Sequence, residues 1–296
     1  MCGGGNRAAT PIVHPDRVLG PLAGFTIGIT GDRRWEEQAE LLVRRGAQTI
    51  HGPVMHTRLL SEADVTLVDT ERALAKPADV VVFTTGIGAR SWFGVAETAT
   101  LDDRLRDLCE NALVVARGPK ARGAAHAHGV EVQWEAPNTA SSEVLAYLQG
   151  RGVAGQRVVI QRDGGEPLLA EQVRALGADV VDVAVYRWEL PEDPGPAERL
   201  LDAVVAGKVH ALTFTCAHAV RSALQLAPDP DGLRSALQTS VVPVAVGPVT
   251  AAALRAEGIV KVVEPTRPRL GAMVQALVNE LATHHRTLRL ADVELR

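Results

Sequence analysis

The stretch Ala178–Leu190, ADVVDVAVYRWEL, decides how the chain is organised, because a similar stretch occurs earlier in the sequence. When the sequence is shifted on itself so that Gly46 falls on Gly177, the segment Ala47–Thr57 falls on the beginning of the quoted stretch. Two copies this far apart predict two similar halves of α/β type, because a solenoid repeats much shorter modules.

The match between the two copies extends along most of the chain. The same shift aligns three further pairs of segments: Ile29 with Ile160, Asp32 with Asp163, and Phe83-Thr84-Thr85 with Phe214-Thr215-Cys216. A slightly shorter shift then aligns Gly118-Pro119 with Gly247-Pro248. The copies differ at one informative position, where Met55 in the first copy corresponds to Tyr186 in the second.

Short apolar strands alternate with helical segments in both copies. Strands are expected over residues 25–30, 79–83, 111–116 and 130–134 of the first copy and 157–161, 211–215, 241–246 and 261–263 of the second. The twin stretches 47–57 and 178–188 are expected to be extended as well. This alternation is typical of parallel sheets covered by helices on both faces, so the predicted fold class is α/β with two similar parallel-sheet domains.

Length and composition narrow the class of protein. A chain of 296 residues favours two domains, and a formal net charge of −4 gives no basic field for binding nucleic acid. The three cysteines are widely spaced, which indicates a reduced cytosolic protein without a disulfide framework or zinc site. No apolar run is long enough to span a membrane, and residues 1–20 are expected to form a mobile tail, since they lack the apolar core of a signal peptide.

Ligands of parallel α/β sheets bind beyond the carboxyl ends of the strands, where each strand turns into a helix. Five such turns carry polar side chains or glycine: Thr84-Thr85-Gly86-Ile87-Gly88, Arg117-Gly118-Pro119-Lys120, Arg162-Asp163-Gly164-Gly165, Thr215-Cys216-Ala217-His218-Ala219 and Gly247-Pro248-Val249-Thr250. Hydroxyl groups and unpaired backbone N–H groups at helix starts suit carboxylate or phosphate oxygens. These turns are therefore the candidate binding site for an anionic ligand.

Each of these features also has a simpler structural interpretation. A Thr at a helix start often serves only as the helix cap. Cys216 lies close to His218, but neighbours within one turn seldom reach each other, so a small buried cysteine is the alternative to a nucleophile and base. Tyr186 either acts on a ligand or packs its ring against a domain edge with its hydroxyl in water. The glycines after Thr85 do not complete a dinucleotide-binding loop, and the chain has no phosphate-loop signature.

Taken in order, the motifs resemble those of the uroporphyrinogen-III synthase family, from about residue 21 to residue 282. They are the related turns after Phe83 and Phe214, Arg162-Asp163-Gly164, Val185-Tyr186-Arg187 and Val246–Ala252. Enzymes of this family use no cofactor or metal and close the linear tetrapyrrole hydroxymethylbilane, inverting its last pyrrole ring with loss of water. The resemblance implies a cytoplasmic lyase of tetrapyrrole biosynthesis (haem, sirohaem or cobalamin) with an anionic tetrapyrrole as its substrate.

The resemblance also implies that a two-stranded β-ladder, residues 47–57 and 178–189, joins the two α/β domains. Domain one would comprise residues 21–46 and 190–285, and domain two residues 58–177, so the domains are interleaved in the sequence. The substrate would lie in a cleft between them. Tyr186 matches a tyrosine placed to hydrogen-bond the departing hydroxyl group, and Thr250 matches a threonine that lines the cleft, whereas its first-copy counterpart Ala121 has no hydroxyl.

The last residues motivate a second functional hypothesis. Leu288–Arg296, LRLADVELR, alternates apolar and polar residues like a strand, and it resembles the first strand of the winged-helix output domains of bacterial response regulators. The alternative function is a tetrapyrrole-sensing domain, non-catalytic or weakly active, of a transcriptional regulator whose DNA-binding domain follows Arg296. The chain up to Arg296 is itself expected to bind neither a membrane nor nucleic acid, and it is expected to be a monomer.

Overall fold

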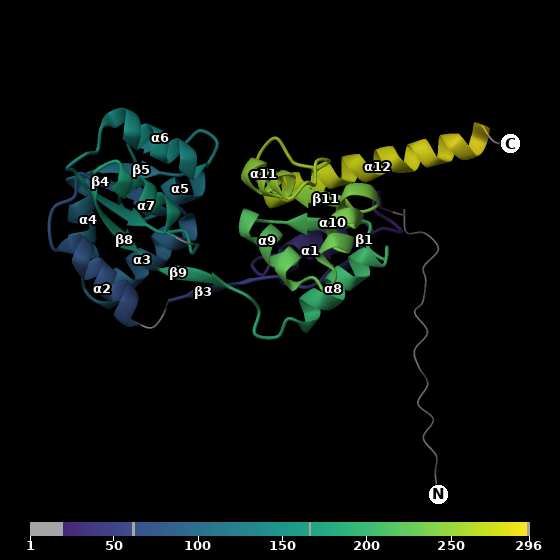
Figure 1. Ribbon diagram of the computed structural model, residues 1–296, viewed down its shortest axis with the longest axis horizontal. Coiled ribbons are helices and arrows are strands. Elements are labelled where there is room, and N and C mark those ends of the chain that lie inside the picture. The colour runs from purple at the N-terminus through teal and green to yellow at the C-terminus, as the bar shows by residue number, and fades with distance from the viewer. Residues whose placement is uncertain (1–19, 61–62, 166, 295–296) are drawn as a thin grey trace, which may run out of the picture.

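The computed structural model describes residues 20–60, 63–165 and 167–294. Over these residues the chain forms two parallel sheets, each surrounded by helices, and a short antiparallel ladder that joins the two domains (Figure 1). The mobile tail expected for residues 1–20 lies outside the described residues, except for Gly20. The prediction of an α/β fold with two similar parallel-sheet domains is confirmed.

The first domain is built on a parallel sheet with the strand order β11-β10-β1-β2. Its strands are β1 (Thr26–Ile29), β2 (Gln48–His51), β10 (Ala211–Phe214) and β11 (Val242–Ala245). Its helices are α1 (Trp35–Val43), α8 (Gly195–Val205), α9 (Ala217–Leu226), α10 (Pro230–Thr239), α11 (Pro248–Ala256) and α12 (Leu270–Glu294). Ile27 and Ile29 pack with buried residues of α1 and α12 on one face of the sheet, and Leu212 and Phe214 pack with α8, α9 and α10 on the other.

The second domain is built on a parallel sheet with the strand order β6-β5-β4-β7-β8. Its strands are β4 (Val80–Phe83), β5 (Leu113–Ala116), β6 (Trp134–Glu135), β7 (Arg157–Gln161) and β8 (Asp179–Val183). Its helices are α2 (Ala63–Leu74), α3 (Gly86–Thr98), α4 (Asp102–Glu110), α5 (Pro119–Ala127), α6 (Ser141–Arg151) and α7 (Leu168–Ala175). All of β4 is buried, because Val81 and Phe83 face one core while Val80 and Val82 face the other, as in a sheet covered on both sides.

The two sheets share one topology. Strands β11, β10, β1 and β2 of the first sheet occupy the same order as β5, β4, β7 and β8 of the second. Strand β6, which lies beyond β5, has only a single parallel bridge from Val244 to Val263 as its counterpart beyond β11. The repeat in the sequence is therefore a repeat of complete sheets, with corresponding strands at corresponding places.

The domains are joined by an antiparallel ladder of β3 (His56–Leu59) and β9 (Tyr186–Glu189), visible between the two domains in Figure 1. The prediction that each twin stretch is one linker strand is wrong, because each contains two strands. The first halves, β2 and β8, are edge strands of the two sheets, and only the second halves pair in the ladder. In the first copy the chain leaves the sheet at Gly52-Pro53, where a Cβ atom on Gly52 would lie 2.5 Å from the carbonyl oxygen of Pro196.

The expectation of a strand over residues 288–296 is also wrong. Helix α12 continues through Glu294, so the part of that run that the structure describes is helical, and this helix extends away from the first domain (Figure 1). The run has a helical spacing as well as an alternating one, since Leu290 is followed by Val293 on the same side of a helix, and Leu, Ala, Glu and Arg favour helices. No helix in the described ranges is both long enough and apolar enough to cross a membrane.

Candidate active site

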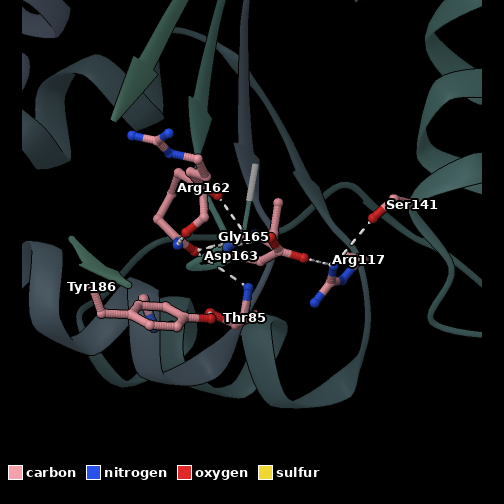
Figure 2. A network of polar contacts seen from close by, with 10 residues as sticks. Thr85, Arg117, Ser141, Arg162, Asp163, Gly165 and Tyr186 are labelled. Carbon is pink, nitrogen blue, oxygen red and sulfur yellow. Dashed lines mark hydrogen bonds and ion pairs between the residues drawn. The ribbon is translucent and has the colours of Figure 1, made fainter. Parts of the chain in front are cut away.

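Tyr186 and Thr85 form the polar pair at the centre of the site (Figure 2). Tyr186 is the first residue of β9, only 2% of it is exposed, and its hydroxyl oxygen lies 3.1 Å from Oγ1 of Thr85. Thr85 caps helix α3, because its Oγ1 accepts a hydrogen bond of 3.0 Å from the backbone N–H of Gly88. The linker strand thus places the tyrosine directly against a helix start of the second domain.

Gly164 makes room for the tyrosine ring. Its φ of +82° is in the left-handed region that favours glycine, and a Cβ atom there would lie 2.3 Å from Cε2 of Tyr186. Its carbonyl oxygen also accepts a hydrogen bond of 3.0 Å from the backbone N–H of Trp188. The turn after β7 therefore fixes both the position of the ring and the strand that carries it.

Burial controls the ionisation of Tyr186. Desolvation raises the pKa of its hydroxyl to about 12, although the hydrogen bond from Thr85 and the nearby charges of Arg117 and Arg33 act in the opposite direction. The phenol is therefore protonated near neutral pH. Because Thr85 Oγ1 already accepts from Gly88, its own proton can be donated to Tyr186, which leaves the phenol proton free for a ligand.

An ion pair lies beside the tyrosine and joins two of the predicted turns (Figure 2). Nη1 of Arg117 donates to Oδ2 of Asp163 at 2.5 Å and to Oγ of Ser141 at 3.1 Å. The other carboxylate oxygen, Oδ1, accepts from the backbone N–H of Gly165 at 3.3 Å. The turns after β5 and β7 and the start of α6 are therefore held together, and the charge of Arg117 is already compensated.

Arg162 is engaged in a second ion pair, on the other side of the same turn. Its Nε lies 3.3 Å from Oδ2 of Asp182 on β8. Burial raises the pKa of the Asp182 carboxyl, with the charge of Arg162 acting in the opposite direction. Arg117 and Arg162 thus hold the turns in place, and neither is a free cation for an anionic ligand.

Several predicted site residues serve the packing of the turns. Thr84 is buried and donates its hydroxyl to the backbone carbonyl of Gln161 at 2.7 Å. Three glycines allow close approach of other residues, since a Cβ atom would lie 2.4 Å from the Lys120 oxygen at Gly86, 2.7 Å from Thr139 at Gly118 and 2.7 Å from Pro268 at Gly247. Their role is to let neighbouring turns lie close together at the edge of each sheet.

In the first copy, sulfur atoms replace the hydroxyl groups of Thr85 and Tyr186, and an imidazole ring lies beside them. Sγ of Cys216 lies 3.6 Å from Sδ of Met55, and burial raises the pKa of the thiol. His218 packs on Trp188 with ring centroids 4.7 Å apart. Burial, followed by the charge of Arg221, lowers the pKa of His218, while the nearby Asp163 of the other domain opposes this. The turns after β10 and β7 therefore face each other.

The remaining predicted residues lie at the starts of α9 and α11. Ala219 and Thr250 are buried, and within the described chain the Thr250 hydroxyl forms no side-chain hydrogen bond. Pro248 and Val249 are exposed in the first turn of α11, and Thr215 borders Gly31, where a Cβ atom would lie 3.1 Å from Oγ1 of Thr215. Thr215 and the start of α9 thus lie beside the turn after β1.

Sequence reasoning missed two groups of residues. Trp188 packs against the cores of both domains, and Gln161 accepts backbone hydrogen bonds of 3.2 Å from Thr84 and Thr85. The second group is Arg33 and Arg34 in the turn after β1, whose charges lower the pKa of Lys120 in the other domain, after the larger effect of burial. The alignment of Asp32 with Asp163 was the available signal, because it places this turn at the position equivalent to Arg162–Gly165.

The site consists of hydroxyl, carboxylate and cationic groups from both domains. Among the residues that the structure describes, no group of three or more His, Cys, Asp or Glu side chains is arranged to hold a metal ion. What the groups can do is hold a polyanion, through cations and helix starts, next to a protonated phenol.

Comparison with known proteins places this chain in a family. The chain is 31% identical to a mutant uroporphyrinogen III synthase from Thermus thermophilus, with a TM-score of 0.73 over 88% of this chain and 99% of that one. Another structure of the Thermus thermophilus synthase, also 31% identical, gives a TM-score of 0.55 over 87% of this chain and 99% of that one. A Bacillus subtilis protein named YjjA is 29% identical over 86% of this chain and 96% of its own length. The family described as uroporphyrinogen-III synthase HemD matches residues 36–275, and the chain therefore belongs to the uroporphyrinogen-III synthase family.

Proposed function

We propose that the protein is an active uroporphyrinogen-III synthase, which cyclises hydroxymethylbilane with inversion of the last pyrrole ring and loss of water. The single observation that carries the proposal is the buried, protonated Tyr186, held by Thr85 at the boundary between the two domains. Membership of the family supplies the reaction, and the tyrosine supplies a group suited to its first step.

The first step breaks the bond between the terminal methylene carbon and its hydroxyl oxygen. The electrons of the pyrrole expel the hydroxyl group, and the departing oxygen has to gain a proton, first through a hydrogen bond, to leave as water. Tyr186 can donate that hydrogen bond because its pKa of about 12 keeps the phenol protonated, and Thr85 can donate to the phenol oxygen as its proton moves away. The product of this step is an electrophilic methylene-pyrrolenine.

Ring closure depends on positioning. The methylene-pyrrolenine closes unaided to the wrong isomer, so the protein has to hold the chain of pyrroles in the geometry that leads to the inverted ring. The substrate carries eight carboxylates, and helix starts can bind carboxylate oxygens without buried side-chain charges. The starts of α3, α5, α9 and α11 follow strands at the carboxyl edges of the two sheets, so they are available for this role.

The sensing alternative has lost the observation that favoured it. It rested on a strand over residues 288–296, and the chain is helical there through Glu294. We therefore propose the enzymatic function alone.

An isomer assay tests the proposal. Purified protein is incubated with freshly made hydroxymethylbilane, and the products are oxidised to uroporphyrins and separated by chromatography. Type III uroporphyrin is expected. If only type I uroporphyrin forms, as in an incubation without protein, the protein is not a synthase. The variant Tyr147→Phe is a matched control, because Tyr147 stacks on Trp134 away from the site and its substitution should leave the isomer ratio unchanged.

A further inference from the structure

Gln161, the last residue of β7, is completely buried, and its amide connects two turns of the second domain. Its Oε1 accepts hydrogen bonds of 3.2 Å from the backbone N–H groups of both Thr84 and Thr85. Its Nε2 donates to the backbone carbonyl of Arg162. Both ends of the amide are therefore bonded to backbone groups, and the side chain joins the turn after β4 to the turn after β7 in one orientation.

The same two turns form two sides of the space that holds Tyr186. Thr85, in the turn after β4, has its Oγ1 3.1 Å from the tyrosine hydroxyl oxygen (Figure 2). Gly164, in the turn after β7, lies against the ring, since a Cβ atom there would be 2.3 Å from Cε2 of Tyr186. The amide of Gln161 therefore fixes the residue that contacts the hydroxyl relative to the residue that supports the ring.

Gly88, in the first turn of α3, makes room for this amide. A Cβ atom on Gly88 would lie 1.9 Å from Nε2 and 2.3 Å from Cδ of Gln161. The backbone N–H of Gly88 also donates to Oγ1 of Thr85 at 3.0 Å. The start of α3 can therefore lie close to both the amide and the capping hydroxyl only because position 88 has no side chain.

The first copy of the repeat has no such amide. The shift that relates the two copies takes Gln161 to Thr30, which is also completely buried. Oγ1 of Thr30 donates to the backbone carbonyl of Thr213 at 2.7 Å, within strand β10, and among the described residues it bonds to none in the turn that follows. The amide is therefore present in the copy that has Tyr186 and absent from the copy that has Met55.

We propose that Gln161 is a positioning residue, whose amide holds the Thr85 hydroxyl and the Tyr186 ring in the relative position from which the phenol donates to the departing oxygen. The reaction in which the phenol acts rests on the proposed function. Without the amide, the backbone N–H groups of Thr84 and Thr85 lose their acceptor, and the turn after β4 has to move to find another. A small displacement of a reacting group is enough to slow a reaction strongly.

Steady-state kinetics of Gln161→Met test the role in turnover, because methionine has a similar shape but no amide. We expect kcat to fall about 10-fold and KM to change less than about twofold, since the phenol is displaced while the ligand contacts remain. In the double variant with Tyr186→Phe this loss should disappear, because the hydroxyl that Gln161 positions is already absent. Unchanged turnover in the single variant, or an equal loss in the Tyr186→Phe background, would overturn the proposal.

Gln38→Met is the matched control for the loss of a buried glutamine. Gln38 is buried in the first domain, where its Nε2 donates to Oγ1 of Thr213 at 2.7 Å. The two variants should lose similar amounts of denaturation midpoint, but Gln38→Met should keep the turnover of the wild type. Equal losses of turnover would show that turnover follows stability and not the position of the tyrosine, which would also overturn the proposal.

Amide hydrogen exchange, followed by NMR in the full-length protein, tests the hydrogen bonds without any substrate. The N–H groups of Thr84 and Thr85 should exchange about 10-fold faster in Gln161→Met than in the wild type, the effect of losing one hydrogen bond. Gly88→Ala is a second variant, which keeps the amide but displaces it, and it should show the same faster exchange and the same fall in kcat if Gln161→Met does not fold.

The two readouts separate this proposal from the synthase proposal. Unchanged exchange at Thr84 and Thr85 would overturn the role of Gln161 whatever the activity of the protein. Type III product from the wild type, with unchanged kcat in the Gln161 and Gly88 variants, would remove only the positioning role. Type I product alone from the wild type, with faster exchange in the variants, would remove the synthase activity and leave the hydrogen bonds of Gln161 to the turn confirmed.

Discussion

The same contact occurs twice in this molecule with different atoms. In the second domain the hydroxyl of Tyr186 lies 3.1 Å from Oγ1 of Thr85, and in the first domain Sδ of Met55 lies 3.6 Å from Sγ of Cys216. The shift that relates the two copies takes Met55 to Tyr186 and Thr85 to Cys216, so the two pairs are equivalent positions of the repeat. One copy has two hydroxyl groups where the other has two sulfur atoms.

The difference separates a contact that packs from a contact that can transfer a proton. Thiol and thioether groups are weak hydrogen-bonding groups that pack as small apolar side chains, whereas two hydroxyls form a directional hydrogen bond with a proton that can be passed on. The helix starts differ in the same way, because the hydroxyl of Thr85 caps α3 with a hydrogen bond, whereas the backbone N–H groups of His218 and Ala219 make only weak contacts with the thiol of Cys216 at the start of α9. Both copies therefore keep the contact between the linker residue and the helix start, but only the second copy has a hydroxyl group there that can donate a proton.

Filling the space beside the tyrosine should have the largest effect on the comparison. Gly164→Ala adds a Cβ atom 2.3 Å from the ring at a φ of +82°, so Tyr186 has to move. We expect turnover to fall about 100-fold or more, as for other displacements of a reacting group by an ångström. Overpacking should also lower the free energy of unfolding by about 1–3 kcal/mol. Both are measured, by isomer assay and by chemical denaturation.

The matched control for this variant is Gly155→Ala. Gly155 has a similar φ of +74° but no heavy atom within 4 Å of the position of a Cβ atom. It should therefore show the cost of the backbone conformation alone, about 1 kcal/mol, with unchanged turnover. Equal losses of turnover in the two variants would mean that the space beside Tyr186 is not what matters.

Removing only the hydroxyl should have the next largest effect. Tyr186→Phe keeps the ring in its place and deletes the hydrogen bond donor, so we expect turnover to fall roughly 10- to 100-fold. KM should change much less, because the ring still fills the same space. Steady-state kinetics measure the two separately. Wild-type turnover in this variant would place Tyr186 with Met55 as a packing residue and would remove the chemical difference between the copies.

The caps sharpen the comparison at the second atom of each pair. Thr85→Val removes both the cap of α3 and the partner of the phenol, and it should lower the free energy of unfolding by about 1 kcal/mol. Turnover should fall less than in Tyr186→Phe, since the phenol proton remains. Cys216→Val is the equivalent change in the other copy and removes only the weak contacts of the thiol with the first turn of α9. A loss of stability in Cys216→Val as large as in Thr85→Val would show that the cap is not the source of the difference.

The ionisation of Tyr186 also distinguishes the copies, through the pH dependence of stability. In the folded protein burial raises the pKa from the ordinary value of 10.0 to about 12. Below pH 10.0 both states hold the proton and this contribution to stability is fully present; above it the unfolded state releases its proton first, so the free energy of unfolding falls until about pH 12. Denaturation curves across this window should be steeper in pH for the wild type than for Tyr186→Phe, and identical slopes would contradict the burial of the phenol.

How far the sequence predicts this fold follows from its two kinds of signal. The repeat and the alternation of strands and helices are long-range signals, and they predict the two parallel sheets. The sequence does not predict that each twin stretch divides into a sheet strand and a ladder strand. Gln48–His51 and His56–Leu59 are both extended, and the strands with which they pair determine which of them joins the sheet. The run from Leu288 fits both the two-residue period of a strand and the 3.6-residue period of a helix. It is helical through Glu294 because it continues helix α12.

The site was predictable as far as its place, at the strand–helix turns, but not in the state of its charges. The sequence offers Arg117, Arg162 and Lys120 as equivalent cations. Only the folded chain shows that Asp163 and Asp182 compensate the first two and leave Lys120 without a side-chain partner among the described residues. Each of these carboxylates lies on a different strand or turn from its arginine, so no local pattern encodes the pairing.

The smallest effect is expected at the sulfur pair, and it closes the comparison. Met55→Leu conserves volume at a buried position and deletes only the contact between sulfur atoms, so it should cost less than about 1.5 kcal/mol of stability. Turnover should change less than twofold, roughly the effect of a mutation that touches no reacting group. The isomer assay and denaturation again supply the measurements. A loss of turnover comparable to that of Tyr186→Phe would mean that both copies take part in the chemistry, because Met55 occupies the position in the first copy that is equivalent to Tyr186 in the second.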